Sequence, residues 1–422
     1  MIKKIIGLLT LLISFTTLAQ KNNISPYSFF GIGDNFENKS VEEMSMGKIG
    51  GAFNSVFELG FTNPASLASL RFTTYGLAAE NKSIELSNGS TKESSSSASL
   101  SYIALGFPVG ENAGVAFGLR PNTTVGYSLV REFTNNDGEL TAINLFSGEG
   151  GTNRVFLGFG HKIGKNFNVG IEAAYIFGNI ENSLLNRRDG VPLATVEKSV
   201  GNVKGSELKA GFQYYTKVSE KLILRSGLTF NIGNDLSNKG EEILYSIVNR
   251  PDGVVNPRDT TVVNSFNINI KNPIETIISI GIGEENKWYS AIEYSFQDAL
   301  NFDDGFSQNN NSFSYGKSSR ISVGGFFTPK FNSITSYWQR VTYRAGLAYK
   351  QTGLIVNNTD INDFGISFGV GLPMGKQLSR INLGFELGQR GETTNDLLKE
   401  NYFNFRVGLS LSDRWFRKRK ID

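Results

Sequence analysis

The chain has 422 residues, a formal net charge of +3, no cysteine and one histidine. The nearly balanced charge gives no reason to expect a nucleic-acid partner, and without cysteine there is no disulfide framework. Hydrophobic residues make up 39% of the chain and glycine is abundant at 47 residues, so the composition is compatible with a soluble all-β protein and with an outer-membrane barrel.

The first residues have the organisation of a secretion signal. Lys3 and Lys4 give a positive start, residues 5–15 are mostly apolar, and small residues lead up to Ala19. The apolar run is shorter than the roughly 20 residues that a membrane-spanning helix needs. We therefore expect cleavage near Ala19 and exclude residues 1–19 from the predicted fold.

Residues 20–71 precede the first predicted strand and contain two short helix signals. Ser40 and Glu43 have the spacing of a capping box. Further along, Asn63 suits a helix cap and Pro64 suits the first helical position. This segment is therefore predicted to be compact, with two short helices.

Beyond residue 71 the chain alternates between apolar and polar residues, the pattern of strands with two unlike faces. In the segment 222–232, for example, Leu224 and Leu228 fall on one face, whereas Arg225 and Thr229 fall on the other. We predict fourteen strands, near residues 72–86, 98–108, 113–131, 153–163, 167–181, 206–217, 222–235, 263–283, 287–298, 318–328, 340–352, 364–373, 380–390 and 402–412.

The predicted connections alternate between short and long. Long polar loops are expected at residues 87–97, 132–152, 182–205, 236–262 and 299–317. Short turns on one side and long loops on the other are typical of outer-membrane barrels, whose short turns and chain ends face the periplasm. The predicted strands reach about 10 residues, as a tilted membrane strand requires, whereas soluble sandwiches use strands nearer 5 or 6 residues. One connection, 329–339, is longer than a periplasmic turn should be.

The fold class predicted is therefore all-β: a transmembrane antiparallel barrel of about fourteen strands. Trp288, Trp338 and Trp415 fall near predicted periplasmic strand ends, where an aromatic girdle belongs. The alternative is that these three tryptophans lie near strand ends by coincidence. A barrel of this size needs its bore filled or leaves a pore. Residues 20–71 are placed to fill it, and we call them the plug.

Residues 45–70, SMGKIGGAFNSVFELGFTNPASLASL, resemble the N-terminal region of FadL-type outer-membrane proteins, the long-chain fatty-acid channel family. The motif residues are Gly50, Gly51 and Ala52, followed by Asn63, Pro64 and Ala65. The resemblance implies a fourteen-stranded barrel with an N-terminal plug. The segments YWQRVTYRAGLAY and SLSDRWFRKRKID in addition resemble a Bacteroidota branch of this family.

The resemblance also implies a route for cargo, because FadL transporters release hydrophobic molecules sideways through a gap associated with a kink in the third strand. Here Arg120, Pro121 and Asn122 interrupt predicted strand three. Proline cannot complete a sheet ladder and is confined to edges and bulges. Pro121 is therefore expected to mark a lateral opening, or alternatively a bulge that only bends the strand.

A candidate ligand-contacting loop lies at 132–152. Leu140, Ile143 and Phe146 would share one face of a helix, since residues three apart are neighbours there. In transporters of this family an extracellular loop helix contributes to the first binding site. The alternative is a loop packed onto the rim of its own barrel.

Seven charged residues fall on the inward-facing side of the predicted strands, and buried charges need partners. We expect them to pair with one another and with the plug, which leaves no apolar path that is traceable from the sequence. They are Glu172, Arg225, Glu293, Arg344, Glu386, Arg390 and Arg406.

No catalytic or metal-binding constellation is recognisable. The one histidine, His161, is predicted at a periplasmic strand end, and no histidine pair, cysteine or carboxylate motif with metal-ligand spacing accompanies it. We expect a non-enzyme without cofactor or metal.

Two functions are compatible with these predictions. The first is passive uptake of a hydrophobic small molecule with lateral release. The second is a non-transporting role as a scaffold or cargo-binding partner of an outer-membrane secretion or assembly complex. The expected organisation is a signal at 1–19, the plug at 20–71, and a barrel at 72–422 that ends in a short basic tail. The expected partners are outer-membrane lipid and either a hydrophobic ligand or other proteins.

Overall fold

The computed structural model describes residues 24–233, 235–248, 257–302, 313–375, 378–395 and 397–415. The predicted secretion signal and most of the basic tail lie outside these ranges.

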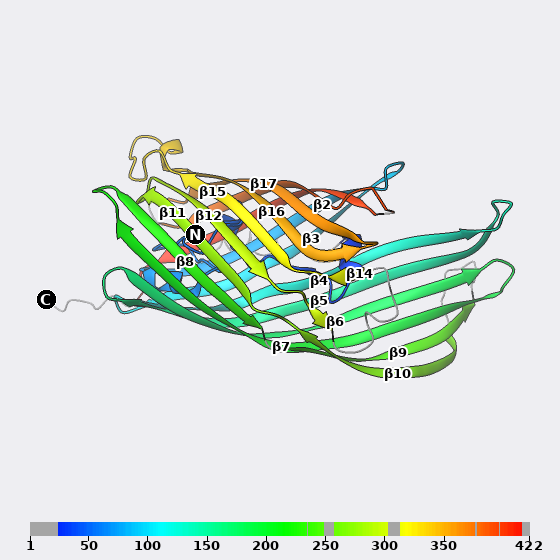
Figure 1. Cartoon of the computed structure of the whole chain (residues 1–422). Coiled ribbons are helices and arrows are strands. Elements are labelled where there is room, and N and C mark those ends of the chain that lie inside the picture. Colours follow the sequence, from blue (N-terminus) through cyan, green and yellow to red (C-terminus); the bar gives the residue numbers. More distant parts are fainter. Residues whose placement is uncertain are drawn as a thin grey trace, which may run out of the picture.

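The described residues form one closed antiparallel barrel that crosses the membrane fourteen times (Figure 1). Ten crossings are single strands, and β19 pairs with β2 to close the ring. The single-strand crossings are β2 (Thr73–Ser87), β3 (Lys92–Val109), β4 (Ala113–Thr134), β5 (Leu140–Ile163), β6 (Phe167–Arg188), β7 (Leu193–Lys217), β16 (Thr342–Val356), β17 (Thr359–Pro373), β18 (Arg380–Arg390) and β19 (Lys399–Asp413).

The other four crossings are each interrupted once. One example is the predicted strand 263–283, which is broken at Pro273 because proline has no N–H for the ladder. The paired pieces are β8 (Leu222–Gly233) with β9 (Leu236–Val248), β10 (Pro257–Lys271) with β11 (Glu275–Glu284), β12 (Trp288–Gln297) with β13 (Asn301–Phe302), and β14 (Phe313–Tyr315) with β15 (Ser318–Phe327).

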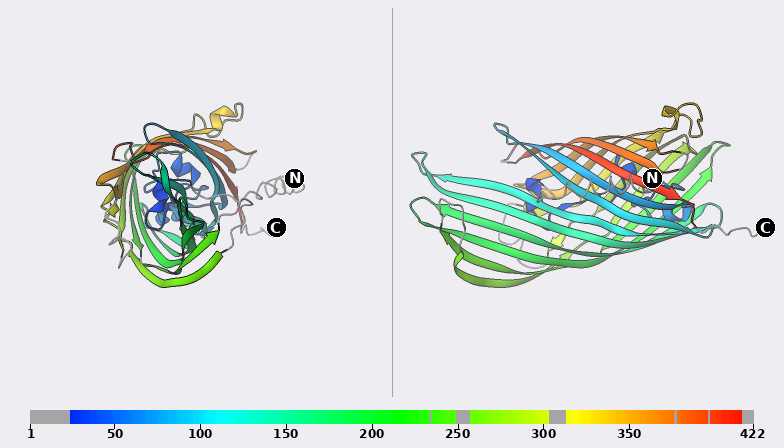
Figure 2. Two further views of the ribbon diagram at one scale, coloured as in Figure 1. Left: turned by 90° about the vertical axis from the view of Figure 1, so that its right-hand side faces the viewer. Right: turned by 180° about the vertical axis from the view of Figure 1, so that it is seen from behind.

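The short turns and both ends of the strand series lie at one end of the barrel (Figures 1 and 2). By the rule for outer-membrane barrels, this end is periplasmic. Trp288 and Trp415 lie there at strand ends, and Trp338 lies in the longer connection between β15 and β16. No helix among the described residues is long and apolar enough to cross a membrane.

The prediction of long extracellular loops was wrong for four of the five segments. In 87–97 only a short turn separates β2, which ends at Ser87, from β3, which begins at Lys92. Strands β4 and β5 continue through residues 132–152, leaving only a turn between Thr134 and Leu140. Residues 182–205 likewise belong mostly to β6 and β7, and the described part of 236–262 belongs to β9 and β10. The polar composition of these segments reflects the medium around them, because β-ladders form in water as well as in lipid.

The strand register shows where the lipid-facing surface of the barrel ends on the extracellular side. On β6 the outward-facing residues are apolar up to Phe177, and Asn179 follows. Phe177 pairs with Asn153 of β5, which in turn pairs with Pro121 of β4. On this side the strands beyond Pro121 therefore extend into the extracellular space.

The candidate ligand helix at 140–146 is also a correction. Leu140, Ile143 and Phe146 belong to β5, where residues three apart point to opposite faces of the sheet. Leu140 is exposed at the tip of the strand, whereas Phe146 packs inside the barrel against Tyr127 and its neighbours.

The plug lies inside the ring of strands (Figure 2). Its elements are η1 (Pro26–Phe29), β1 (Asp34–Asn35), α2 (Val41–Met44) and η2 (Pro64–Ser69). The predicted capping box is confirmed, since Ser40 caps α2 and the Glu43 side chain accepts from the Ser40 backbone. Asn63 and Pro64 also begin a helix as predicted, although η2 is of the 3-10 type.

Candidate functional site

The glycine pair of the plug is bound to a carboxylate of the barrel wall. The backbone N–H groups of Gly50 and Gly51 donate to Glu293 Oε2 at 2.9 and 2.7 Å. Lys39 Nζ contacts the other oxygen of Glu293 at 3.2 Å. Glycine is needed at position 50 because a Cβ there would clash with the side chains of Glu43 and Thr62. The glycine pair is thus explained by close packing between the plug and the buried Glu293.

Asn63 joins three parts of the structure. Its Oδ1 accepts from the Ala65 N–H at 3.0 Å, which caps η2. Its Nδ2 donates to the carbonyl oxygens of Gly51, within the plug, and Phe212, on β7, at 2.9 and 3.0 Å. The side chain is fully buried. One amide therefore fixes the helix start, the glycine turn and the wall relative to one another.

We expect Asn63→Ala to lower the free energy of unfolding by about 1–3 kcal/mol, because it removes a helix cap and leaves buried carbonyls without a donor. Urea unfolding in lipid vesicles, followed by tryptophan fluorescence, measures this change. Asn54→Ala is a matched control in the same segment, since half-buried Asn54 makes one long bond of 3.5 Å to Gln213. Equal losses in both variants would contradict the assigned role of Asn63.

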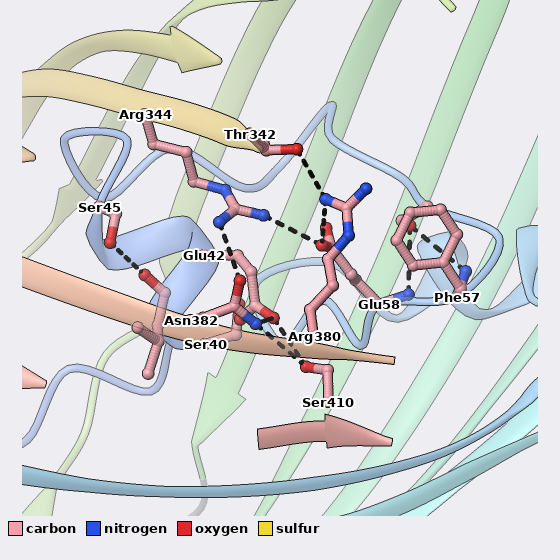
Figure 3. Close-up of polar contacts among 12 residues, drawn as sticks. Ser40, Glu42, Ser45, Phe57, Glu58, Thr342, Arg344, Arg380, Asn382 and Ser410 are labelled. Carbon is pink, nitrogen blue, oxygen red and sulfur yellow. Dashed lines mark hydrogen bonds and ion pairs between the residues drawn. The ribbon is translucent and has the colours of Figure 1, made fainter. Parts of the chain in front are cut away.

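A second cluster binds the plug acids Glu42 and Glu58 to β16, β18 and β19 (Figure 3). Arg344 and Arg380 lie 3.0 and 3.4 Å from Glu58 Oε1. Asn382 and Ser410 donate to Glu42 Oε1 at 2.7 and 2.9 Å. All of these side chains are buried, so the cluster holds the plug without access to bulk water.

The pKa values of two plug carboxyl groups are shifted in opposite directions. Burial and the nearby Glu58 carboxylate raise the pKa of Glu42, and in the described residues its Oε2 has no hydrogen-bond partner. Burial alone would also raise the pKa of Glu37, but Lys350 and Arg320 hold it well below its usual value. Glu37 is therefore a permanent anion that links the plug to β15 and β16.

A third cluster lies within the wall beside the plug. Glu172 on β6 contacts Arg120, Arg154 and Lys209 at 2.9, 3.2 and 3.5 Å. The Arg120 guanidinium also contacts the rings of Phe61 and Phe156, at 4.6 and 4.1 Å from their centroids. Arg120, a predicted gate residue, thus points inward and anchors the plug through Phe61.

Six of the seven predicted lumen charges form ion pairs in the structure. Glu172, Glu293 and Arg344 pair as described above, Arg390 pairs with Asp34 of the plug, Glu386 pairs with Lys48 of the plug and with Arg406, and Arg406 also pairs with Glu80. Arg225 is the exception. Its guanidinium lies over the Tyr289 ring at 5.7 Å, and no described carboxylate lies within ion-pair distance of it.

The wall is split on the extracellular side of Leu119. The β3–β4 ladder runs from Val109–Ala113 to Ile103–Leu119 and then stops, although both strands continue. The β2–β3 and β4–β5 hairpins diverge above this point (Figures 1 and 2). A bulge follows Pro121 on the other edge of β4, which is consistent with a proline that disturbs the ladder.

The plug occupies part of this split. Strand β1 pairs with β4 through Asp34–Thr124 and Asn35–Thr123, at the edge of β4 that β3 has left. The Phe36 N–H also donates to the carbonyl of Asn122, the third predicted gate residue, at 2.9 Å. Residues 34–36 are therefore bound to the edge of β4 at the split, and we call them the latch. This strand was not indicated by the sequence.

Apolar side chains line the bore next to the split. Val125 and Tyr127 of β4 belong to a buried cluster with Ile176, Ile180, Val203, Leu236 and Ile270. Phe29 of the plug and Phe146 of β5 pack against the cluster. The ring centroid of Phe29 lies 5.2 Å from that of Tyr127 and 6.1 Å from that of Phe146. An apolar surface thus reaches the split from inside, which the sequence did not reveal.

A cavity of about 190 Å³ lies between the plug and the wall behind the split. Ser97 and Ser101 of β3 and Thr124 of β4 border it on the side of the split. The rest of its lining combines apolar and aromatic residues, such as Phe30, Tyr102 and Tyr402, with acidic and basic side chains in equal number: Asp34, Glu37, Glu80, Asp363, Glu386 and Glu400, and Lys39, Lys48, Lys82, Lys350, Arg390 and Arg406. Among the described residues, no group of three His, Asp or Glu side chains is arranged to hold a metal.

A closed barrel of fourteen crossings, with an N-terminal plug and a split beside the third crossing, defines an outer-membrane-type barrel. The family model named BamG matches residues 1–422. The chain belongs to the BamG family. No curated protein matches the chain.

Solved structures with a similar fold include hydrocarbon channels and transporters. The toluene transporter TodX of Pseudomonas putida matches with a TM-score of 0.60 and 15% identity over 90% of this chain and 100% of that chain. The monoaromatic hydrocarbon channel CymD matches with a TM-score of 0.59 and 14% identity over 91% and 100%. A FadL homologue of Pseudomonas aeruginosa matches with a TM-score of 0.55 and 12% identity over 88% and 97%. At these identities the similarity shows the fold.

Proposed function

We propose that the barrel passes hydrophobic small molecules between its extracellular vestibule and the membrane, sideways through the split between β3 and β4. The observation that carries this proposal is the apolar cluster around Tyr127, Phe29 and Phe146, which borders the split. An apolar lining favours an apolar ligand. The buried ion pairs below the apolar cluster leave no apolar route along the barrel axis, so lateral release is the favoured direction.

The gate in this proposal is the pairing of β1 with β4, next to Pro121. Movement of residues 34–36 away from Thr123 and Thr124 would open the split. The named solved structures are channels and transporters, which supports a non-enzymatic role. The Bacteroidota branch of the resemblance stays a prediction from the sequence.

The test is a disulfide that fixes the latch. Asn35 and Thr123 are direct cross-strand partners, and such pairs approach the Cβ separation that a disulfide needs. The chain has no other cysteine, so the pair Asn35→Cys and Thr123→Cys reacts only with itself. Cells carrying the oxidised variant are expected to take up labelled toluene or oleate at least tenfold more slowly than cells carrying the reduced variant. Equal uptake in both states would rule out this gate.

The charged cavity favours a second function, a non-transporting partner barrel of an outer-membrane complex. Twelve ionisable side chains around a cavity of about 190 Å³ suit a polar occupant better than a hydrocarbon, because a hydrocarbon offers them no hydrogen bond. Under this function, neither toluene nor oleate is taken up in either redox state. Purification in mild detergent would then recover a second protein in a stoichiometric amount.

A further inference from the structure

The connection between β15 and β16, residues 328–341, projects outward from the periplasmic rim. It lies outside the ring of strands in each view (Figures 1 and 2). Its tip is apolar and uncovered: Ile334 is 100% exposed, Trp338 66% and Tyr337 41%. Exposing three large apolar or aromatic side chains to water is unfavourable, so we expect another surface to cover this tip.

The segment is rigidly supported. The Lys330 N–H donates to the Gln339 carbonyl at 2.8 Å, and the Ser333 hydroxyl donates to Gln339 Oε1 at 2.8 Å. The rings of Tyr337 and Trp338 pack edge to face with centroids 5.8 Å apart. A connection that is longer than a turn needs to be, and is cross-braced in this way, presents its tip in a defined position.

The tip is continuous with the lipid-facing surface of the barrel. Phe327 and Tyr343 are cross-strand partners at the foot of β15 and β16, and both face outward with 49% and 38% of their surface exposed. The Tyr343 hydroxyl donates to the Trp338 carbonyl at 3.4 Å. Because the projection is radial, the tip lies beside the membrane and not below the bore.

We propose that residues 328–341 form an interfacial foot, with Ile334, Tyr337 and Trp338 inserted into the boundary between headgroups and acyl chains of the periplasmic leaflet. Tryptophan and tyrosine prefer this depth because one end of each ring system is apolar and the other is polar. Lys330, which is exposed near the start of the foot, is placed to meet a lipid phosphate. This inference is independent of the transport proposal.

The foot also contacts the plug. Phe331 stacks on Phe57 of the plug with ring centroids 6.2 Å apart, and the Arg380 guanidinium lies 5.6 Å from the Phe331 ring. Arg380 in turn contacts Glu58 (Figure 3). The foot therefore joins the periplasmic leaflet to the cluster that holds the plug.

The test uses a fluorophore at the tip. Since the chain has no cysteine, Ile334→Cys creates a unique site for an environment-sensitive nitrobenzoxadiazole label. The labelled protein is reconstituted in phosphatidylcholine vesicles, with or without bromine on the acyl chains. We expect at least twofold quenching by the brominated lipid. Ser90→Cys, in the exposed turn between β2 and β3, is the aqueous control and should be quenched by less than a fifth.

Quenching at Ile334→Cys that does not exceed quenching at Ser90→Cys would overturn the foot. A photo-crosslinker at Ile334 in native membranes that links to protein, together with absent lipid quenching, would equally overturn it and assign the tip to a protein partner. Trp338→Cys, labelled in the same way, repeats the measurement should the first variant fold poorly.

Discussion

Glu293→Ala is expected to release the glycine turn of the plug and to lower the free energy of unfolding by about 3–5 kcal/mol, the typical cost of removing one partner of a buried ion pair. Glu293 is 1% exposed and accepts from two backbone N–H groups while it contacts Lys39 and Arg320. Its loss leaves two buried cations short of a counter-charge and two amides without an acceptor.

The measurement has two parts. Urea unfolding in vesicles gives the change in stability, and conductance across a planar bilayer reports whether the bore opens when the plug loosens. Glu85→Gln is the control, because the Glu85–Lys92 ion pair is at least as short, 2.9 Å, but has exposed side chains. That variant should stay within about 1 kcal/mol of the wild type. If the Glu293 variant is as stable as the control and shows no more conductance, Glu293 does not anchor the plug.

Glu172→Gln is expected to cost a similar amount, about 3–5 kcal/mol, because three buried cations then share only Glu207. The effect should be coupled to Arg120, which is 1% exposed and contacts two aromatic rings. Replacing that cation as well, in Glu172→Gln with Arg120→Met, should recover part of the lost stability. Methionine keeps the contact with Phe61 and Phe156 but carries no charge.

A double-mutant cycle on urea unfolding measures the coupling, which we expect to exceed about 1 kcal/mol for residues in direct contact. Glu284→Gln, at an exposed periplasmic turn beside Lys287, serves as the control. Strict additivity of the two substitutions would show that Arg120 and Glu172 do not depend on each other.

The barrel was predictable because lipid imposes a periodic pattern on each crossing. One face must be apolar and the other faces a filled bore, so strands such as β6 and β19 alternate clearly. The caps at Ser40 and Asn63 were predictable for a different reason: their partners lie three and two residues away. Both patterns are local in sequence.

The extracellular strand extensions were not predictable by the same rule. Beyond Pro121 and Phe177 the outer face of the sheet no longer meets lipid, so the alternation fades on that face although the ladder continues and residues such as Val125 and Ile180 still pack inside the bore. The segment at Leu140, Ile143 and Phe146 was mistaken for a helix because three spaced apolar residues fit either period over so short a stretch. The long ladders that this segment forms with β4 and β6 show that it is a strand.

The sequence alone determined that this chain alternates like a membrane barrel, carries a capped N-terminal segment and has a proline in its third crossing. Only the tertiary structure decided which charges meet, because ring closure brings together residues as distant as Gly50 and Glu293, which are 243 positions apart. It likewise decided that Arg225 stacks on Tyr289 and that β1 pairs with β4. The strand pattern reflects the surrounding lipid at each residue, whereas the ion pairs and the latch depend on where the closed ring places the plug.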